Sequence, residues 1–174
     1  SAAAEAARAA GQPGKWVFTL HAPSIWPFLS YAENRELRRQ IFTAYIKRGD
    51  NGNEYDNKQI LARIAALRAE RAKLLGYPTY AHYALEERMA KEPAQVYGLL
   101  NQLWEPALKV ARREAAELQK LIDEQGGNHK LEPWDWRYYA ERIKQARYKL
   151  DEDQLREYFP LDNVLKGAFY VANR

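Results

Sequence analysis

The sequence predicts an all-α fold, an elongated array of several helices, and three observations lead to this prediction. Apolar residues recur at helical spacing from Asn34 onward, helix-starting and helix-stopping residues bracket most of these stripes, and only residues 15–20 resemble a strand. With 174 residues, 47% of them hydrophobic, the chain is long enough to bury roughly 70% of its unfolded surface in one domain. We therefore treat residues 1–174 as a single helical segment.

The first helix in this pattern is expected between Asn34 and Gly49. Its apolar face is formed by Leu37, Ile41, Ala44 and Tyr45. Gly49 can end the helix, and Lys47 and Arg48 would complement the negative carboxyl end of its dipole.

Two further helices are expected before Met89. Asp56 and Gln59 resemble a capping box in front of the first. Its apolar stripe consists of Ile60, Leu61, Ile64, Leu67, Leu74 and Leu75. Gly76 and Pro78 stop it, and Thr79 caps a shorter helix that runs to Met89.

The longest helical pattern runs from Pro93, a favourable first-turn residue, to Gly126-Gly127. Its stripe comprises Val96, Leu99, Leu100, Leu103, Ala107, Val110, Ala111, Leu118, Leu121 and Ile122. At about 1.5 Å per residue this helix would span roughly 50 Å, whereas a compact chain of this length is about 40 Å across. The helix must therefore either kink at Pro106 or project as an elongated antiparallel layer.

Three elements are expected near the carboxyl end. Asp135 would cap a helix with an inner face of Trp136, Tyr139, Ala140 and Ile143. Asp151 with Gln154 would cap the next element, which Pro160 ends. The last apolar pattern consists of Val164, Leu165, Ala168, Phe169 and Ala172, and it reaches Arg174 without a stop signal, as a helix cut short would.

The one strand-like stretch, residues 15–20, combines β-branched and aromatic residues in an extended run. The sequence offers no convincing second strand. We expect that its partner lies outside the chain or that the segment is simply extended.

Charge and hydropathy bear on the kind of partner. There are 27 Lys and Arg residues against 23 Asp and Glu residues, a formal net charge of +4, which would suit nucleic acid. Acidic and basic residues are interleaved, however, so nucleic acid is not the expected partner. The longest uncharged stretch, residues 16–32, contains prolines, serines and a histidine, and we expect no membrane partner. The alanine-rich start carries both charge signs and does not resemble a signal peptide.

The sequence contains few candidates for chemistry. Zero cysteines exclude a thiol nucleophile and a cysteine-ligated zinc site. The histidines His21, His82 and His129 form no His-Glu-x-x-His motif, and His82 with Glu86 is the nearest approach to a pair of metal ligands. An isolated histidine on a charged helix is more often a solvated surface group.

Three other clusters have plainer structural interpretations. Residues 50–56 superficially resemble a calcium loop but favour a solvated turn, because position twelve of the loop, Leu61, is not glutamate. Asp151, Glu152 and Asp153 favour capping over a catalytic pair. The densest aromatic region favours a helix-packing core over a peptide- or base-stacking surface: Trp134, Trp136, Tyr138, Tyr139, Tyr148, Tyr158 and Phe159. We therefore assign no catalytic, cofactor-binding or metal-binding residue.

A series of short motifs nevertheless resembles the thimet oligopeptidase family of zinc metallopeptidases, and within it the bacterial peptidyl-dipeptidases. The motifs are Asn34-Arg35-Glu36-Leu37-Arg38, Tyr55-Asp56-Asn57-Lys58-Gln59-Ile60, Leu74-Leu75-Gly76-Tyr77, Met89-Ala90, Pro133-Trp134-Asp135-Trp136-Arg137-Tyr138-Tyr139-Ala140-Glu141, Asp151-Glu152-Asp153-Gln154-Leu155 and Tyr158-Phe159-Pro160-Leu161. The likeness extends from about Gly14 to Arg174, and it rests on the shared order and spacing of the motifs.

The resemblance implies an all-helical zinc peptidase that encloses a channel and removes dipeptides from the carboxyl ends of short peptides. In that family the zinc-binding helix lies downstream of the matched segment, so this segment is expected to bind no zinc and to be inactive alone. It would form one wall of the channel, in partnership with the catalytic portion of the same polypeptide and with short peptide substrates. We expect a cytoplasmic location, with the periplasm as the alternative.

Two other functions stay open at this point. The chain could be a free-standing helical module that binds nucleic acid, or a helical domain whose long helix presents a groove to another protein. The first predicts binding that weakens steeply with added salt.

Overall fold

The computed structural model describes residues 2–149, 155 and 157–174. The helices it contains are α1 (Ala2–Ala9), α2 (Ala22–Tyr31), α3 (Arg35–Ile46), α4 (Lys58–Leu74), α5 (Tyr80–Leu85), α6 (Pro93–Glu124), α7 (Trp136–Tyr148) and α9 (Leu161–Ala172). The described residues contain no strand, which confirms the all-α prediction.

Residues 15–20 form neither a helix nor a strand in the structure. A backbone hydrogen bond from the Val17 N–H to the Ala3 carbonyl, 3.0 Å long, ties the segment to α1. A strand needs a ladder of such bonds from a neighbouring strand, and helix α1 cannot supply one.

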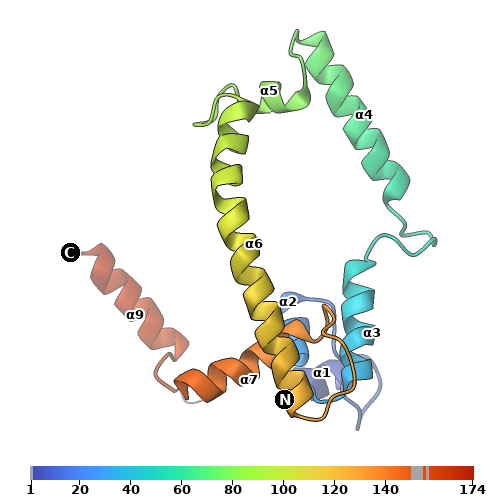
Figure 1. Ribbon diagram of the computed structural model, residues 1–174, viewed down its shortest axis with the longest axis vertical. Helices are drawn as coiled ribbons and strands as arrows, with labels where there is room; N and C mark the ends of the chain where they lie inside the picture. Colours follow the sequence, from blue (N-terminus) through green and yellow to red (C-terminus); the bar gives the residue numbers. More distant parts are fainter. Residues whose placement is uncertain (1, 150–154, 156) are drawn as a thin grey trace.

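The helices are arranged as an open, elongated frame (Figure 1). Helices α3, α4, α5 and α6 follow one another around it, while α1, α2 and α7 gather at the end of the frame where α3 begins and α6 ends. Helix α9 extends away from the rest. The predicted elongation is therefore confirmed.

Several predicted helix boundaries are confirmed by their caps. The Asn34 side-chain oxygen accepts a 3.0 Å hydrogen bond from the Leu37 N–H at the start of α3. Thr79 caps α5 through the His82 N–H at 3.4 Å, and Pro93 opens α6. Gly49 follows α3 with a φ of +75°, a left-handed conformation that favours glycine.

The long helix α6 is a single element of 32 residues that continues through Pro106. Figure 1 shows that it projects beyond the helices gathered at one end of the frame, as expected for an elongated arrangement. Its C-terminal half packs against α7, and its N-terminal end meets α5.

Three expectations about helices need correction. Helix α2 was not expected, because Pro23 and Pro27 obscure its pattern, although Pro23 lies in the first turn, where its missing N–H costs nothing. Helix α5 ends at Leu85 rather than Met89. Helix α4 begins at Lys58, and Asp56 accepts bonds from the Lys58 and Gly52 N–H groups instead of forming the expected box with Gln59.

The predicted cap formed by Asp151 and Gln154, and the acidic residues Glu152 and Asp153, lie outside the described residues. The final apolar pattern forms α9, which begins just after Pro160.

Most of the buried apolar side chains lie at the end of the frame where α3 begins and α6 ends, which we call the lower end (Figure 1). The buried apolar residues of α2, α6 and α7 are Ile25, Leu29, Leu118, Ile122, Tyr138 and Tyr139. By contrast, α4, the N-terminal half of α6 and α9 expose many large apolar side chains. In the part of the chain that the structure describes, no helix is both long and apolar enough to cross a membrane.

Candidate functional site

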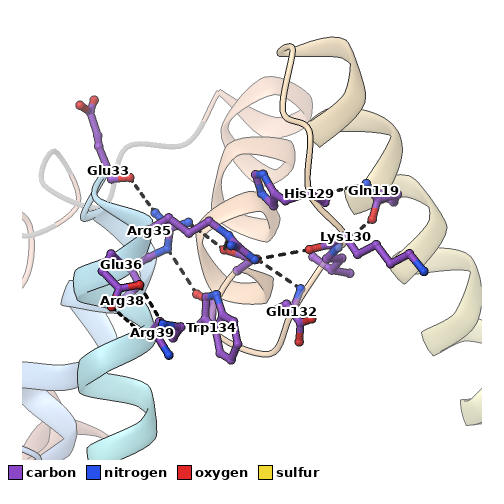
Figure 2. A network of polar contacts seen from close by, with 12 residues as sticks. Glu33, Arg35, Glu36, Arg38, Arg39, Gln119, His129, Lys130, Glu132 and Trp134 are labelled. Carbon is purple, nitrogen blue, oxygen red and sulfur yellow. Dashed lines mark hydrogen bonds and ion pairs between the residues drawn. The ribbon is translucent and has the colours of Figure 1, made fainter.

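The most strongly built polar site is a buried ion-pair network at the lower end of the frame. Figure 2 shows Arg35 and Arg38 reaching from α3 toward the loop that carries Lys130, Glu132 and Trp134. The side chain of Asp135, just before α7, is completely buried, and Arg38 is 1% exposed.

The carboxylate of Asp135 accepts hydrogen bonds from three groups. Arg38 Nη2 donates to Oδ1 at 2.9 Å, and Arg35 Nη2 donates to Oδ2 at 2.8 Å. The Glu132 N–H donates to Oδ2 at 3.2 Å. Both oxygens are therefore engaged by charged donors, and charge-assisted hydrogen bonds of this kind are stronger than those between neutral groups.

The guanidinium group of Arg38 is equally well satisfied. Its Nη1 donates to the carbonyls of Ala32 and Glu33 at 2.8 and 2.9 Å, and its Nε donates to the Trp134 carbonyl at 3.3 Å. The group also lies over the ring of Tyr138, 4.0 Å from the centroid. Arg38 thus joins the end of α2, the start of α3 and the segment that leads into α7.

The hydrogen bonds of this network all run between groups of the chain itself. A general base needs a free lone pair within reach of a substrate proton, and the buried Asp135 carboxylate has none to offer. The expectation that Asp135 caps α7 is corrected accordingly. Asp135 occupies the cap position, but its side chain makes no capping bond to α7 because two arginines bind both of its oxygens.

Sequence reasoning missed this network, because its members are 97 and 100 residues apart. The only signal was that Arg35 and Arg38 lie one turn apart and so share a helix face.

A second set of polar contacts fixes the loop between α6 and α7. The Gln119 side chain donates to the His129 carbonyl at 3.0 Å and accepts from the Leu131 N–H at 2.7 Å. The ring of His129 lies 6.4 Å from that of Tyr139, whose pKa is raised by burial. This loop is therefore held against both helices.

The histidines do not assemble into a metal site. Among the described residues, no three His, Asp or Glu side chains lie where they could hold a metal ion together. His21 precedes α2, His129 lies in the loop before α7, and His82 Nδ1 contacts its own cap, Thr79, at 2.8 Å. Glu86 accepts a hydrogen bond from Tyr77 and raises the pKa of that phenol, so His82 and Glu86 each have another partner within the chain.

The loop that resembled a calcium site, residues 50–56, is a turn whose carboxylates pair with the ammonium group of a lysine. The Lys58 ammonium group bonds Asp56 Oδ2 at 2.6 Å and also pairs with Asp50. Hydrogen bonds from Lys58 lower the pKa of Asp56 to about 2. The lysine occupies the position between the two carboxylates, and the predicted solvated turn is confirmed.

The aromatic region is a packing core only over part of its length. Tyr138 and Tyr139 are buried, and Trp134 and Trp136 are half-buried. Tyr148, Tyr158 and Phe159, however, are exposed.

A pocket of about 530 Å³ lies beside the aromatic core, between α2 and α7. Its walls include Trp26, Phe42 and Trp134, and the Arg137 guanidinium stacks over Trp26 at 4.2 Å. Lys144 and Glu141 pair with each other at its rim. Its charged groups already have partners within the chain, whereas the buried indole N–H of Trp134, which also lines the pocket, has no hydrogen-bond partner.

Comparison with known proteins identifies the family. The model of peptidase family M3 matches residues 28–174. The dipeptidyl carboxypeptidase of Salmonella typhimurium is 36% identical over 173 residues, which are 99% of this chain and 25% of the relative. The oligopeptidase A of Haemophilus influenzae is 38% identical over 177 aligned positions, with 99% and 26% coverage. Saccharolysin of Saccharomyces cerevisiae is 33% identical over 159 residues.

The chain therefore spans about a quarter of the length of the curated relatives that it matches most extensively. The family match covers all of α3 to α7 and α9, including both sides of the Arg38–Asp135 pair. The resemblance inferred from the ordered motifs is confirmed. The chain belongs to peptidase family M3.

Proposed function

We propose that this chain is the helical scaffold of a zinc-dependent M3 peptidase, and that the rest of the polypeptide supplies the zinc-binding and catalytic groups. The observation that carries the proposal is a family match over most of the chain without any group of metal-holding side chains among the described residues. Because the residues present do not fit a zinc ion, we derive no catalytic step from them.

The proposed activity is the release of dipeptides from the carboxyl ends of short peptides. Relatives named dipeptidyl carboxypeptidase and oligopeptidase A are similar to this chain to nearly the same degree, so overall identity does not favour either name. We favour dipeptide release because the ordered motifs between Asn34 and Leu161 resemble most the bacterial peptidyl-dipeptidases.

The proposed role of the segment is to form one wall of the peptide channel. Two features support this role. The Arg38–Asp135 network joins α3 to the end of α2 and to the segment before α7, and the exposed apolar helices provide surface for packing against the catalytic portion. We propose a cytoplasmic location, and one relative is named a probable cytosolic oligopeptidase A.

The proposal is tested with a chimera in which this chain replaces the matched quarter of the Salmonella typhimurium dipeptidyl carboxypeptidase. We expect the chimera to bind zinc and release C-terminal dipeptides from short peptides, measured by mass spectrometry. The chain alone should bind no stoichiometric zinc and cleave nothing. Hydrolysis or stoichiometric zinc binding by the chain alone would contradict the proposal, as would a folded, zinc-loaded chimera without activity.

A further inference from the structure

The long helix α6 has one apolar face that is covered at one end and bare at the other. At 100° per residue, Leu118 and Ile122 in the C-terminal half point in the same direction as Leu100 and Trp104 in the N-terminal half. Leu118 and Ile122 are 3% and 0% exposed because they pack in the core with α7. Leu100 and Trp104 are 51% and 65% exposed.

The bare part of this face has the spacing of a helix-packing seam. We call it the upper seam, and it consists of Tyr97, Leu100, Trp104, Ala107 and Ala111. These positions alternate three and four residues apart, the repeat that places side chains along the line of contact with a neighbouring helix. Four of them line one apolar groove together with Leu103. The seam is about 21 Å long at 1.5 Å per residue, enough for a partner helix of about four turns.

The opposite face of the same stretch is polar and exposed, with Gln102, Glu105 and Lys109 on it. An apolar face on one side and a charged face on the other indicate a helix that packs on one side only. The two halves of α6 therefore show the same pattern, but among the described helices only α7, in the lower half, buries this face. Helix α5 contacts the N-terminal end of α6 and leaves Leu100 and Trp104 exposed.

We infer that the upper seam packs against a helix contributed by the part of an M3 polypeptide outside this span. This inference rests on the proposed function. The relatives are about four times as long as the aligned segment, so their further chain is long enough to supply such a helix. Helix α7 already packs against the lower part of the same face of α6, and the inferred helix would pack beside it along that face. A helix of the same polypeptide also avoids the loss of translational and rotational freedom that a second copy would undergo on binding.

Introduced thiols test the inference, because the chain contains no cysteine. The variants Leu100→Cys and Ala107→Cys place a thiol in the upper seam, and Gln102→Cys places a matched control on the polar face. Each variant is labelled with a thiol reagent in the chain alone and in the full-length chimera, and mass spectrometry reads the labelling at the introduced site. Ala107→Cys changes little volume, so it serves if Leu100→Cys disturbs the fold.

We expect labelling of both seam variants to slow by at least about tenfold in the chimera, because the thiol reacts only when the packing opens. The Gln102→Cys variant should label at the same rate in both contexts. Equal labelling of the seam variants in the chimera and in the chain alone overturns the inference. Labelling of the chain alone that slows with rising protein concentration also overturns it, because a second copy then covers the seam.

The two proposals can fail separately. The proposed function is judged by dipeptide release from the unsubstituted chimera, whereas the seam is judged by the labelling rates. An active chimera with a fully reactive seam would contradict only the inference about α6.

Discussion

At the scale of single residues, the buried carboxylate of Asp135 is the point on which three segments of the chain depend. It neutralises charge from Arg35 and Arg38, and Arg38 in turn satisfies backbone carbonyls at the end of α2 and before α7. A buried ion pair of this kind adds little over an apolar pair of equal size, but losing one partner leaves a buried charge unpaired. The network is therefore expected to add little net free energy of unfolding, whereas the loss of either partner should destabilise the fold strongly.

The Asp135→Asn variant should lose about 3–5 kcal/mol of unfolding free energy, because the shape is kept while Arg38 stays buried without its counter-charge. Urea unfolding followed by far-UV circular dichroism measures this loss. Glu36→Gln is the matched control, since it removes an exposed ion pair with Arg39 and should leave the midpoint unchanged. Equal midpoints for the two variants would show that the network does not hold the helices together.

The pKa of Asp56 gives a prediction for acid conditions. Hydrogen bonds from Lys58 lower it to about 2 in the folded chain, compared with about 3.9 for an unperturbed aspartate. Because the folded value is the lower one, this carboxylate stabilises the fold fully above about pH 3.9 and loses that contribution as the pH falls toward 2.

A carboxyl-carbon NMR titration should therefore place the Asp56 midpoint near 2 in the wild type. In Lys58→Gln the midpoint should rise toward the ordinary value, because the side-chain bond from Lys58, which lowers the pKa most, is removed. An unchanged midpoint in this variant would mean that the lysine does not occupy the position between Asp50 and Asp56.

Residue roles were predictable from the sequence only where the partners are close along the chain. The predicted cap at Thr79 acts over three residues, and the preference for threonine at that position is local. The bond between Arg38 and Asp135 spans 97 residues, so an acidic residue before a helix was interpreted as a cap. Only the folded arrangement distinguishes a capping carboxylate from a buried counter-ion.

At the scale of helices, periodicity predicted those elements whose faces differ in polarity. Helices α3, α6 and α9 appear where their stripes and flanking residues indicate. Helix α2 has no charged residue and two prolines, so no polar face marked its period. Helix α5 is shorter than expected. Residues 86–89, which were predicted to continue it, form turns, and Lys91 shortly after them has a left-handed backbone conformation.

Pro106 provides a test at this scale, because it lies within α6 and lacks the N–H that would bond to the Gln102 carbonyl. The Pro106→Ala variant should restore that bond and stabilise α6 by up to about 3 kcal/mol. Thermal unfolding and amide hydrogen exchange at residues 102–110 measure the effect. Ala107→Gly is a matched comparison on the next residue and should act in the opposite direction, by roughly 1 kcal/mol. A lower melting temperature for Pro106→Ala would show that the proline is required for the shape of α6.

At the scale of the whole molecule, the chain divides into a packed end and an open end. Buried apolar residues concentrate where α2, α6 and α7 meet, while α4, the N-terminal half of α6 and α9 carry exposed Ile, Leu, Phe and Trp side chains. The sequence predicted the elongation from the length of one helix, but it could not predict which faces would stay bare. Every apolar stripe looks the same in a sequence, whether its partner lies in this chain or elsewhere.

This division predicts how a probe of exposed apolar surface will respond. The dye ANS fluoresces on apolar surface that water can reach, so the chain alone should enhance its emission several-fold. The full-length chimera should bind much less dye per molecule, because the bare faces of α4, α6 and α9 become covered. A Leu103→Gln variant of the chain alone should weaken the emission, while Gln102→Leu on the polar face should strengthen it. Equal emission from the chain alone and from a folded chimera would mean that these helices remain solvent-exposed in the chimera.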